Sequence, residues 1–157
     1  PLTGRLAVAC ALAVALPLGA AIAAETTLPS WAVVVFPSGA EFTVEIAADP
    51  ADRARGYMGR AAVGPKEGML FVFEQEGRHG FWMKNCLVSL DMIWLDEALR
   101  VVDIAPSVPP CPAEGECPET MPAAPARYAL EVAGGTAERN GLRPGDRVVV
   151  LSEPAFP

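Results

Sequence analysis

Hydrophobic positions near the start of the folded region recur at every second residue, which is the spacing of a β-strand. The segment 41–47 alternates apolar with polar side chains, and the β-branched run 33–36 precedes it across the turn-forming residues 37–39. Alternating runs on either side of a short turn are typical of a β-hairpin. The segment 91–105 repeats this arrangement around a polar turn at 96–99 and predicts a second hairpin.

Four further segments carry strand patterns. The run 68–73 is apolar at odd and even positions alike, which predicts a strand buried on both faces. The polar residues 74–77 that follow it predict a turn. The remaining predicted strands are 80–86, 128–133 and 147–151.

Two short helices are predicted between these strands. Asp49 is a suitable N-cap and Pro50 a suitable first helical residue, so a helix is expected from Pro50 to about Met58. The segment 135–141 fits one or two helical turns, with Thr136 as the expected cap. The sequence thus predicts a single α+β domain over residues 33–151. Its main feature is an antiparallel sheet curled into a barrel or a sandwich.

A proline-rich loop is expected at 106–125, where seven of twenty residues are proline. Proline excludes a helix there and argues strongly against a central strand. Cys111 and Cys117 lie in the loop, six residues apart and without nearby histidines or further thiols that would suggest zinc. We therefore predict a Cys111–Cys117 disulfide that keeps the loop ordered.

The first 24 residues have the pattern of a secretory signal peptide. Arg5 precedes a long run of small apolar residues, and small side chains at its end suggest cleavage after Ala23 or Ala24. An uncleaved membrane anchor is less favoured because no basic cluster follows the run, and Cys10 lies too early for a lipoprotein site. Segment 1–24 is therefore expected to direct export to the periplasm or beyond the cell, with no stable membrane insertion after cleavage.

The charge balance narrows the range of partners. Without Arg5 the chain keeps 11 basic and 19 acidic side chains, a net charge of −8. Nucleic acids and anionic lipids require a basic face, so neither is an expected partner. We expect a monomer without a cofactor that binds a small molecule or an envelope protein.

The predicted strand 80–86 determines which side chains share a face, and this bears on two possible activities: a Cys–His nucleophile and a Cu(I) site. A continuous strand would place Phe81, Met83 and Asn85 on the face of His79, and Trp82, Lys84 and Cys86 on the other. Cys86 and His79 would then lie about 23 Å apart, which excludes a Cys–His nucleophile. His79 and Met83 would lie about 13 Å apart, so a Cu(I) site would need Met58 or Met69 from another element.

Polar residues in apolar surroundings form the remaining candidate site. Its members are Arg60, Glu67, Phe81, Trp82, Lys84, Asn85 and Asp91. One interpretation is a structural network of paired charges, since buried charges are costly unless paired. The other is a ligand pocket in which Phe81 and Trp82 form stacking walls. An enzyme using Asp91 or Glu67 with Lys84 is a further alternative, although no paired-carboxylate or triad spacing supports it.

Four ordered motifs resemble one known family. They are Arg55-Gly56-Tyr57-Met58-Gly59-Arg60, the run 68–73, Phe81-Trp82-Met83-Lys84-Asn85, and Leu90-Asp91. Together they are similar to domain of unknown function family 192, also called uncharacterised protein family 0127. The resemblance implies an exported, compact, β-rich domain with short helices and no established activity. Cys86 stands where that family often has threonine, which argues further against a catalytic thiol.

A second, local resemblance covers about a dozen residues. The segment 137–148 is similar to the helix–turn–strand piece of PDZ domains, but it lacks their carboxylate-binding glycine loop. A helix cap followed by a Pro-Gly-Asp turn accounts for it. The favoured function is therefore a non-enzymatic binding or accessory module of the cell envelope, specific for a small ligand or an extended peptide.

Overall fold

The structure, a computed structural model, describes residues 30–152 and residue 156. The predicted signal peptide, 1–24, lies outside the described residues. The elements are β1 (Trp31–Val35), β2 (Glu41–Ala47), α1 (Pro50–Arg55), β3 (Glu67–Gly77), β4 (Phe81–Trp82), β5 (Leu90–Leu95), β6 (Val101–Val108), β7 (Glu119–Thr120), β8 (Ala126–Ala133), α2 (Thr136–Arg139) and β9 (Val149–Leu151). No helix in this described part of the chain is long and apolar enough to cross a bilayer.

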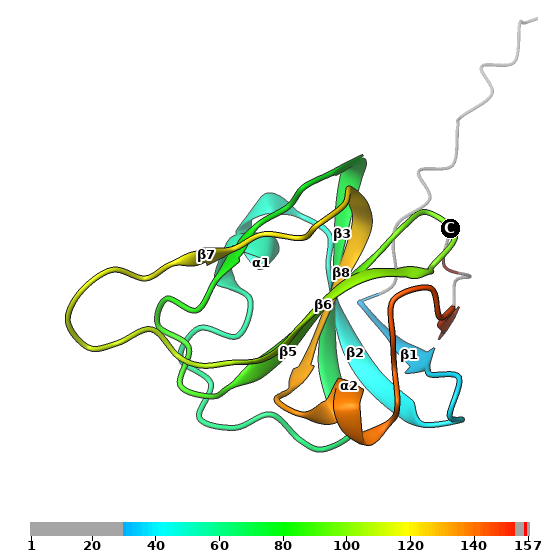
Figure 1. Cartoon of the computed structure of the whole chain (residues 1–157), viewed down its shortest axis with the longest axis horizontal. Helices are drawn as coiled ribbons and strands as arrows, with labels where there is room; N and C mark the ends of the chain where they lie inside the picture. Colours follow the sequence, from blue (N-terminus) through cyan, green and yellow to red (C-terminus); the bar gives the residue numbers. More distant parts are fainter. Residues whose placement is uncertain (1–29, 153–155, 157) are drawn as a thin grey trace, which may run out of the picture.

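Seven strands form one curled sheet in the order β6-β5-β8-β3-β2-β1-β9, and β4 pairs with β7 in a separate ribbon. Every pairing is antiparallel except that of β2 with β3, which α1 connects as a crossover (Figure 1). A single bridge between Arg100 and Arg147 brings the two edges together at one end. Within the described residues the sheet is thus strongly curled but not a closed barrel, and the predicted fold class is confirmed.

Both faces of the central strands β3, β5 and β8 are buried. On one face Leu70, Ile93 and Leu130 pack against side chains of the β1–β2 hairpin. On the other face a second core contains Phe71 and Trp94. Figure 1 shows α1 and β7 to the left of these strands and β1 to the right. A side chain on either face of β8 is therefore shielded from bulk water, whatever its polarity.

Helix α1 begins as predicted and ends earlier. The Asp49 carboxylate accepts the backbone N–H groups of Ala51 and Asp52 at 2.8 and 2.9 Å, and Pro50 is the first helical residue. The helix stops at Arg55 rather than near Met58, because Gly56 turns the chain with a φ of 45°. This early stop brings the segment after α1 back over the sheet.

The predicted strand 80–86 is wrong beyond Trp82. Strand β4 contains two residues, and a turn follows in which the Cys86 N–H donates to the Met83 carbonyl at 3.1 Å. Asn85 adopts a φ of 57°, which a strand residue does not. The alternation of side chains and the two separations based on it therefore do not apply to 83–86.

The thiol and the imidazole are nonetheless in different surroundings. The His79 ring stacks on Phe73 with centroids 3.6 Å apart, and its Nε2 lies 3.0 Å from the Gln75 carbonyl oxygen. Cys86 is buried in the second core. Among the described residues, no three His, Cys, Asp or Glu side chains gather closely enough to hold a metal ion.

The proline-rich loop 106–125 contains more strand than predicted. Strand β6 continues through Pro106 to Val108, which is possible because β6 is an edge strand and its outer backbone groups need no partner. The short β7 also falls in the loop. The predicted disulfide between Cys111 and Cys117 is present. The predicted turn at 74–77 is instead the end of β3.

Candidate functional site

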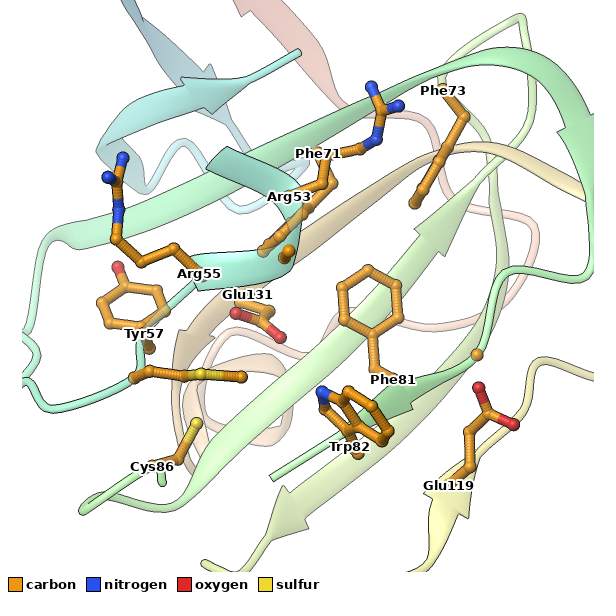
Figure 2. Close-up of a pocket in the computed structure, with 14 residues that line it drawn as sticks. Arg53, Arg55, Tyr57, Phe71, Phe73, Phe81, Trp82, Cys86, Glu119 and Glu131 are labelled. Atoms are coloured by element: carbon orange, nitrogen blue, oxygen red, sulfur yellow. The ribbon is translucent and has the colours of Figure 1, made fainter. Parts of the chain in front are cut away.

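A cavity of about 280 Å³ lies between α1, β3, β4 and β8. Five aromatic side chains line it, and Figure 2 shows them from several elements around a common space: Tyr57, Phe71, Phe73, Phe81 and Trp82. Ligand pockets usually have volumes of about 300–1,000 Å³, so this cavity lies just below that range and would admit only a small ligand.

The aromatic walls are held by contacts with one another. Phe81 meets the ring of Phe71 edge-on with centroids 4.9 Å apart, and it lies 6.0 Å from the Trp94 ring. Trp94 is fixed in turn, because its Nε1 donates to the His79 carbonyl at 2.9 Å. Edge-to-face pairs contribute about 0.5–1.5 kcal/mol beyond their buried area. One wall of the cavity is therefore set before any ligand arrives.

Gly56 lets the backbone pass close above the cavity. A Cβ at this position would meet the Phe71 ring at 3.4 Å and the Glu131 Oε2 at 3.9 Å. Its φ of 45° also disfavours any residue with a side chain. The glycine of the Arg55-Gly56-Tyr57 motif thus shapes the end of α1 and keeps space in front of Glu131.

Glu131 on β8 is buried at the base of the cavity. Its side chain is 4% exposed, and its register partners on the neighbouring strands are Met69 and Met92. In the part of the chain that the structure describes, its carboxyl group has no hydrogen bond or ion pair. Figure 2 shows the carboxyl group among Tyr57, Phe81 and Trp82. A carboxyl group with no partner faces an aromatic cavity.

Burial in these apolar surroundings raises the pKa of Glu131 to about 8. At neutral pH the group is therefore mostly a neutral carboxylic acid. Burial raises the pKa of the Cys86 thiol, and the nearby Glu131 raises it further. Burial likewise raises the pKa of Tyr57 above its usual value. A thiol with a raised pKa is a poor nucleophile, and at neutral pH all three groups are mostly uncharged.

The arginines at the rim already have partners. Arg53 donates to the carbonyl groups of Ala48 and Val72, and Arg55 pairs with Asp52. Figure 2 shows both guanidinium groups pointing away from Glu131.

Asp91, a predicted site residue, holds the fold together. It is completely buried, and its carboxylate accepts the backbone N–H groups of Ser107, Gly135 and Ala137 at 2.7, 2.8 and 2.7 Å. The bonds tie β5 to β6 and to the start of α2. They also correct the predicted cap. Gly135, which has no side chain, occupies the N-cap position, Thr136 is the first helical residue, and Asp91 supplies the acceptor for the Ala137 N–H.

Arg60 and Glu67 lie outside the cavity lining. Arg60 forms a bidentate ion pair with Glu45, and the hydrogen bonds from Arg60 lower the pKa of Glu45. Glu67 accepts the Gly64 N–H at 3.0 Å. Each side chain is thus engaged with its own local partner.

Lys84 and Asn85 belong to the turn after β4. The Lys84 ammonium lies 5.7 Å from the centroid of the Trp82 ring. The Asn85 carbonyl accepts the Gly59 N–H at 2.9 Å, which links this turn to the segment after α1. Of the seven predicted site residues, the cavity brings together Phe81 and Trp82.

Sequence reasoning missed Glu131, although a signal was present. Alternation in 128–133 places Glu131 on the same face as Ala129 and Ala133, which are both apolar. A lone charge on an otherwise apolar face indicates burial rather than a solvated face. Its position in the centre of the sheet became evident only from the strand order.

The family model of DUF192, described as "Uncharacterized ACR", matches residues 33–150. The chain belongs to the DUF192 family. A solved structure of a protein of unknown function from Novosphingobium aromaticivorans is similar to this DUF192 chain. Their identity is 34%, the TM-score is 0.68, and 76% of this chain and 83% of that chain are covered.

A second solved structure, of a protein described as a putative transcription regulator from Sinorhizobium meliloti, is also similar to this DUF192 chain. It is 32% identical with a TM-score of 0.65, covering 76% of this chain and 92% of that chain. No curated protein matches the chain.

Proposed function

We propose that this DUF192 domain is a non-enzymatic binding module that holds a small ligand in the cavity above Glu131. The unpartnered Glu131 carboxyl carries the proposal. No completely buried side-chain oxygen among the described residues lacks a hydrogen-bond partner, so the unpartnered Glu131 oxygens are accessible from the cavity. A ligand that bonds to this carboxyl and packs against Phe81 and Trp82 would use a hydrogen-bonding group that the protein itself leaves unused.

The contacts of the polar residues support binding over catalysis. Both oxygens of Asp91 are used by backbone N–H groups, Glu67 is bonded to Gly64, and Lys84 lies over Trp82. A hydrolase or transferase would need such groups free and directed to one point. A Cu(I) site using His79 is also less well supported, because that ring does not line the cavity and stacks elsewhere.

The Cys111–Cys117 disulfide indicates a compartment outside the cytoplasm. We propose that segment 1–24 is a signal peptide cleaved after Ala23 or Ala24, and that the domain acts as a monomer in the periplasm or outside the cell. Its net charge of −8 after cleavage supports a small molecule or an envelope protein as the partner, rather than nucleic acid.

A probe screen on the protein from residue 25 onward tests the binding role. The probes are neutral, cationic and anionic aryl-alkyl compounds together with Cu(I), and the measurements are thermal shift and calorimetry. We expect at least one class of aryl-alkyl probe to bind, and Trp82→Ala to weaken that binding about 2- to 10-fold by removing an aromatic wall.

Trp31→Ala is the matched control, because Trp31 is similarly exposed but lies on β1 outside the cavity lining (62% against 54% for Trp82). It should leave the affinity unchanged. The proposal fails if no organic probe binds at millimolar concentration, or if the two tryptophan variants weaken binding equally.

A further inference from the structure

We infer that the ligand carries a protonated amine, which Glu131 receives as a carboxylate inside the ring of aromatic side chains. The inference rests on the proposed function and specifies the chemical class of its ligand. It follows from three features of the cavity: the unpartnered acceptor, the aromatic faces around it, and the charges at the rim.

The first feature is the need of the Glu131 carboxyl for a donor. The strands on either side present Met69 and Met92 opposite Glu131, and neither can donate a hydrogen bond to it. An ammonium group brings both N–H donors and a compensating charge. Hydrogen bonds between ionised partners are about twice as strong as those between neutral groups. An amine therefore satisfies this site better than a hydroxyl or an amide.

The second feature is the set of rings around the carboxyl. The face of an aromatic ring is negative and attracts a cation within about 6 Å of its centroid. Two of the lining rings already carry cations of this chain: Lys84 lies 5.7 Å from the centroid of Trp82, and Arg60 lies 5.0 Å from that of Tyr57. With Phe71 and Phe81 beside Glu131, the cavity combines an anion with cation-attracting walls.

The third feature is the balance of charge. From β3 and β5 only apolar side chains face Glu131 across the strand pairings. The other titratable groups that line the cavity come from α1, the turns after α1 and β4, and β7: Arg53, Arg55, Tyr57, Cys86 and Glu119. The two arginines are engaged by carbonyl groups and by Asp52, and the tyrosine and thiol have raised pKa values. A ligand carboxylate would place a second acid beside Glu131, whereas an amine would pair with the ionised Glu131 carboxylate.

Proton exchange gives this inference a distinctive signature. The pKa of Glu131 is about 8, whereas an alkyl amine such as lysine ionises at about 10.4. Between pH 6 and pH 8 the amine is charged but the carboxyl is mostly protonated. Binding therefore releases the Glu131 proton to solvent, and the affinity should rise about tenfold from pH 6 to pH 7.

The test is calorimetry of the protein from residue 25 onward with three matched probes at pH 6, 7 and 8. The probes are 2-phenylethylammonium, neutral 2-phenylethanol and anionic 3-phenylpropionate. We expect the ammonium to bind most tightly, with proton release that is measurable as a dependence on buffer ionisation enthalpy. Glu131→Gln should weaken ammonium binding at pH 8 about tenfold or more, because the charged acceptor is lost.

Glu41→Gln is the control for a general charge effect, because Glu41 is exposed on β2 and does not line the cavity. It should change the affinity much less than Glu131→Gln. The blocked peptide acetyl-Gly-Lys-Gly-amide, compared with butylammonium, tests the source of the amine: tighter binding of the peptide assigns the group to a protein side chain, and tighter binding of butylammonium assigns it to a small molecule.

Two kinds of failure are distinguishable. If the alcohol or the carboxylate binds as tightly as the ammonium, or if Glu131→Gln keeps the ammonium affinity, the amine inference is overturned while the cavity remains a binding site. If none of the probes binds at millimolar concentration, the proposed binding function fails as well.

Discussion

Replacing Glu131 with glutamine should stabilise the ligand-free protein, and the gain should grow with pH. The pKa of Glu131 is raised by burial from 4.5 to about 8 in the folded state. Below pH 4.5 the group is protonated in both states and imposes no penalty. As pH rises to about 8 the unfolded chain ionises this group freely while the folded protein resists, so stability is lost. At about 1.4 kcal/mol for each pH unit, the loss approaches roughly 5 kcal/mol.

Urea unfolding at pH 5, 7 and 9 measures this effect. The glutamine side chain resembles the protonated acid, so the variant should differ little from the parent at pH 5 and be clearly more stable at pH 9. Glu119→Gln controls for the general effect of one charge, since Glu119 is exposed at the rim. A stability difference that stays constant from pH 5 to pH 9 would show that Glu131 is not buried as described.

Asp91→Asn should destabilise the fold by about 3–5 kcal/mol. The carboxylate accepts three backbone N–H groups, from Ser107, Gly135 and Ala137. Asparagine has a single acceptor oxygen, and its NH₂ group would point at an N–H donor. The attachment of α2 and β6 to β5 would be weakened, whereas the cavity, which Asp91 does not line, would keep its shape.

Asp103→Asn provides the matched control for this change. Asp103 also accepts two backbone N–H groups, from Ile104 and Ala123 at 2.8 and 2.7 Å, but it is only partly buried. Its replacement should cost about 1 kcal/mol or less in urea unfolding. Equal losses from the two variants would contradict the structural role of Asp91, as would a parent-like stability of Asp91→Asn.

Features encoded by neighbouring residues were predictable from the sequence. The β1–β2 hairpin follows from alternation around a proline–glycine turn, and the start of α1 follows from Asp49 and Pro50. The Cys111–Cys117 disulfide follows from short spacing in a loop. Each lies within a segment of fewer than twenty residues, a range over which local chemistry determines the backbone.

Features that depend on distant contacts were not predictable in this way. The turn at 83–86 requires Asn85 in a left-handed conformation, and the Asn85 carbonyl bonds to Gly59, far away in sequence. From the sequence, Asp91 could bind a ligand or stabilise the fold. The three backbone N–H groups that bond to its carboxylate lie 16 to 46 residues away in the chain. Glu131 faces a cavity because β8 lies between β5 and β3, with α1 over that face.

The protonation of Glu131 is the most direct measure of the proposed site. Carbon-13 NMR of its side-chain carboxyl can follow the titration in protein without ligand and in protein saturated with 2-phenylethylammonium. The expected result is a pKa near 8 in the free protein and a markedly lower value with the amine bound. A free-protein pKa near the usual 4.5 would contradict the buried, unpartnered carboxyl, and a value near 8 that the amine leaves unchanged would contradict its role in binding.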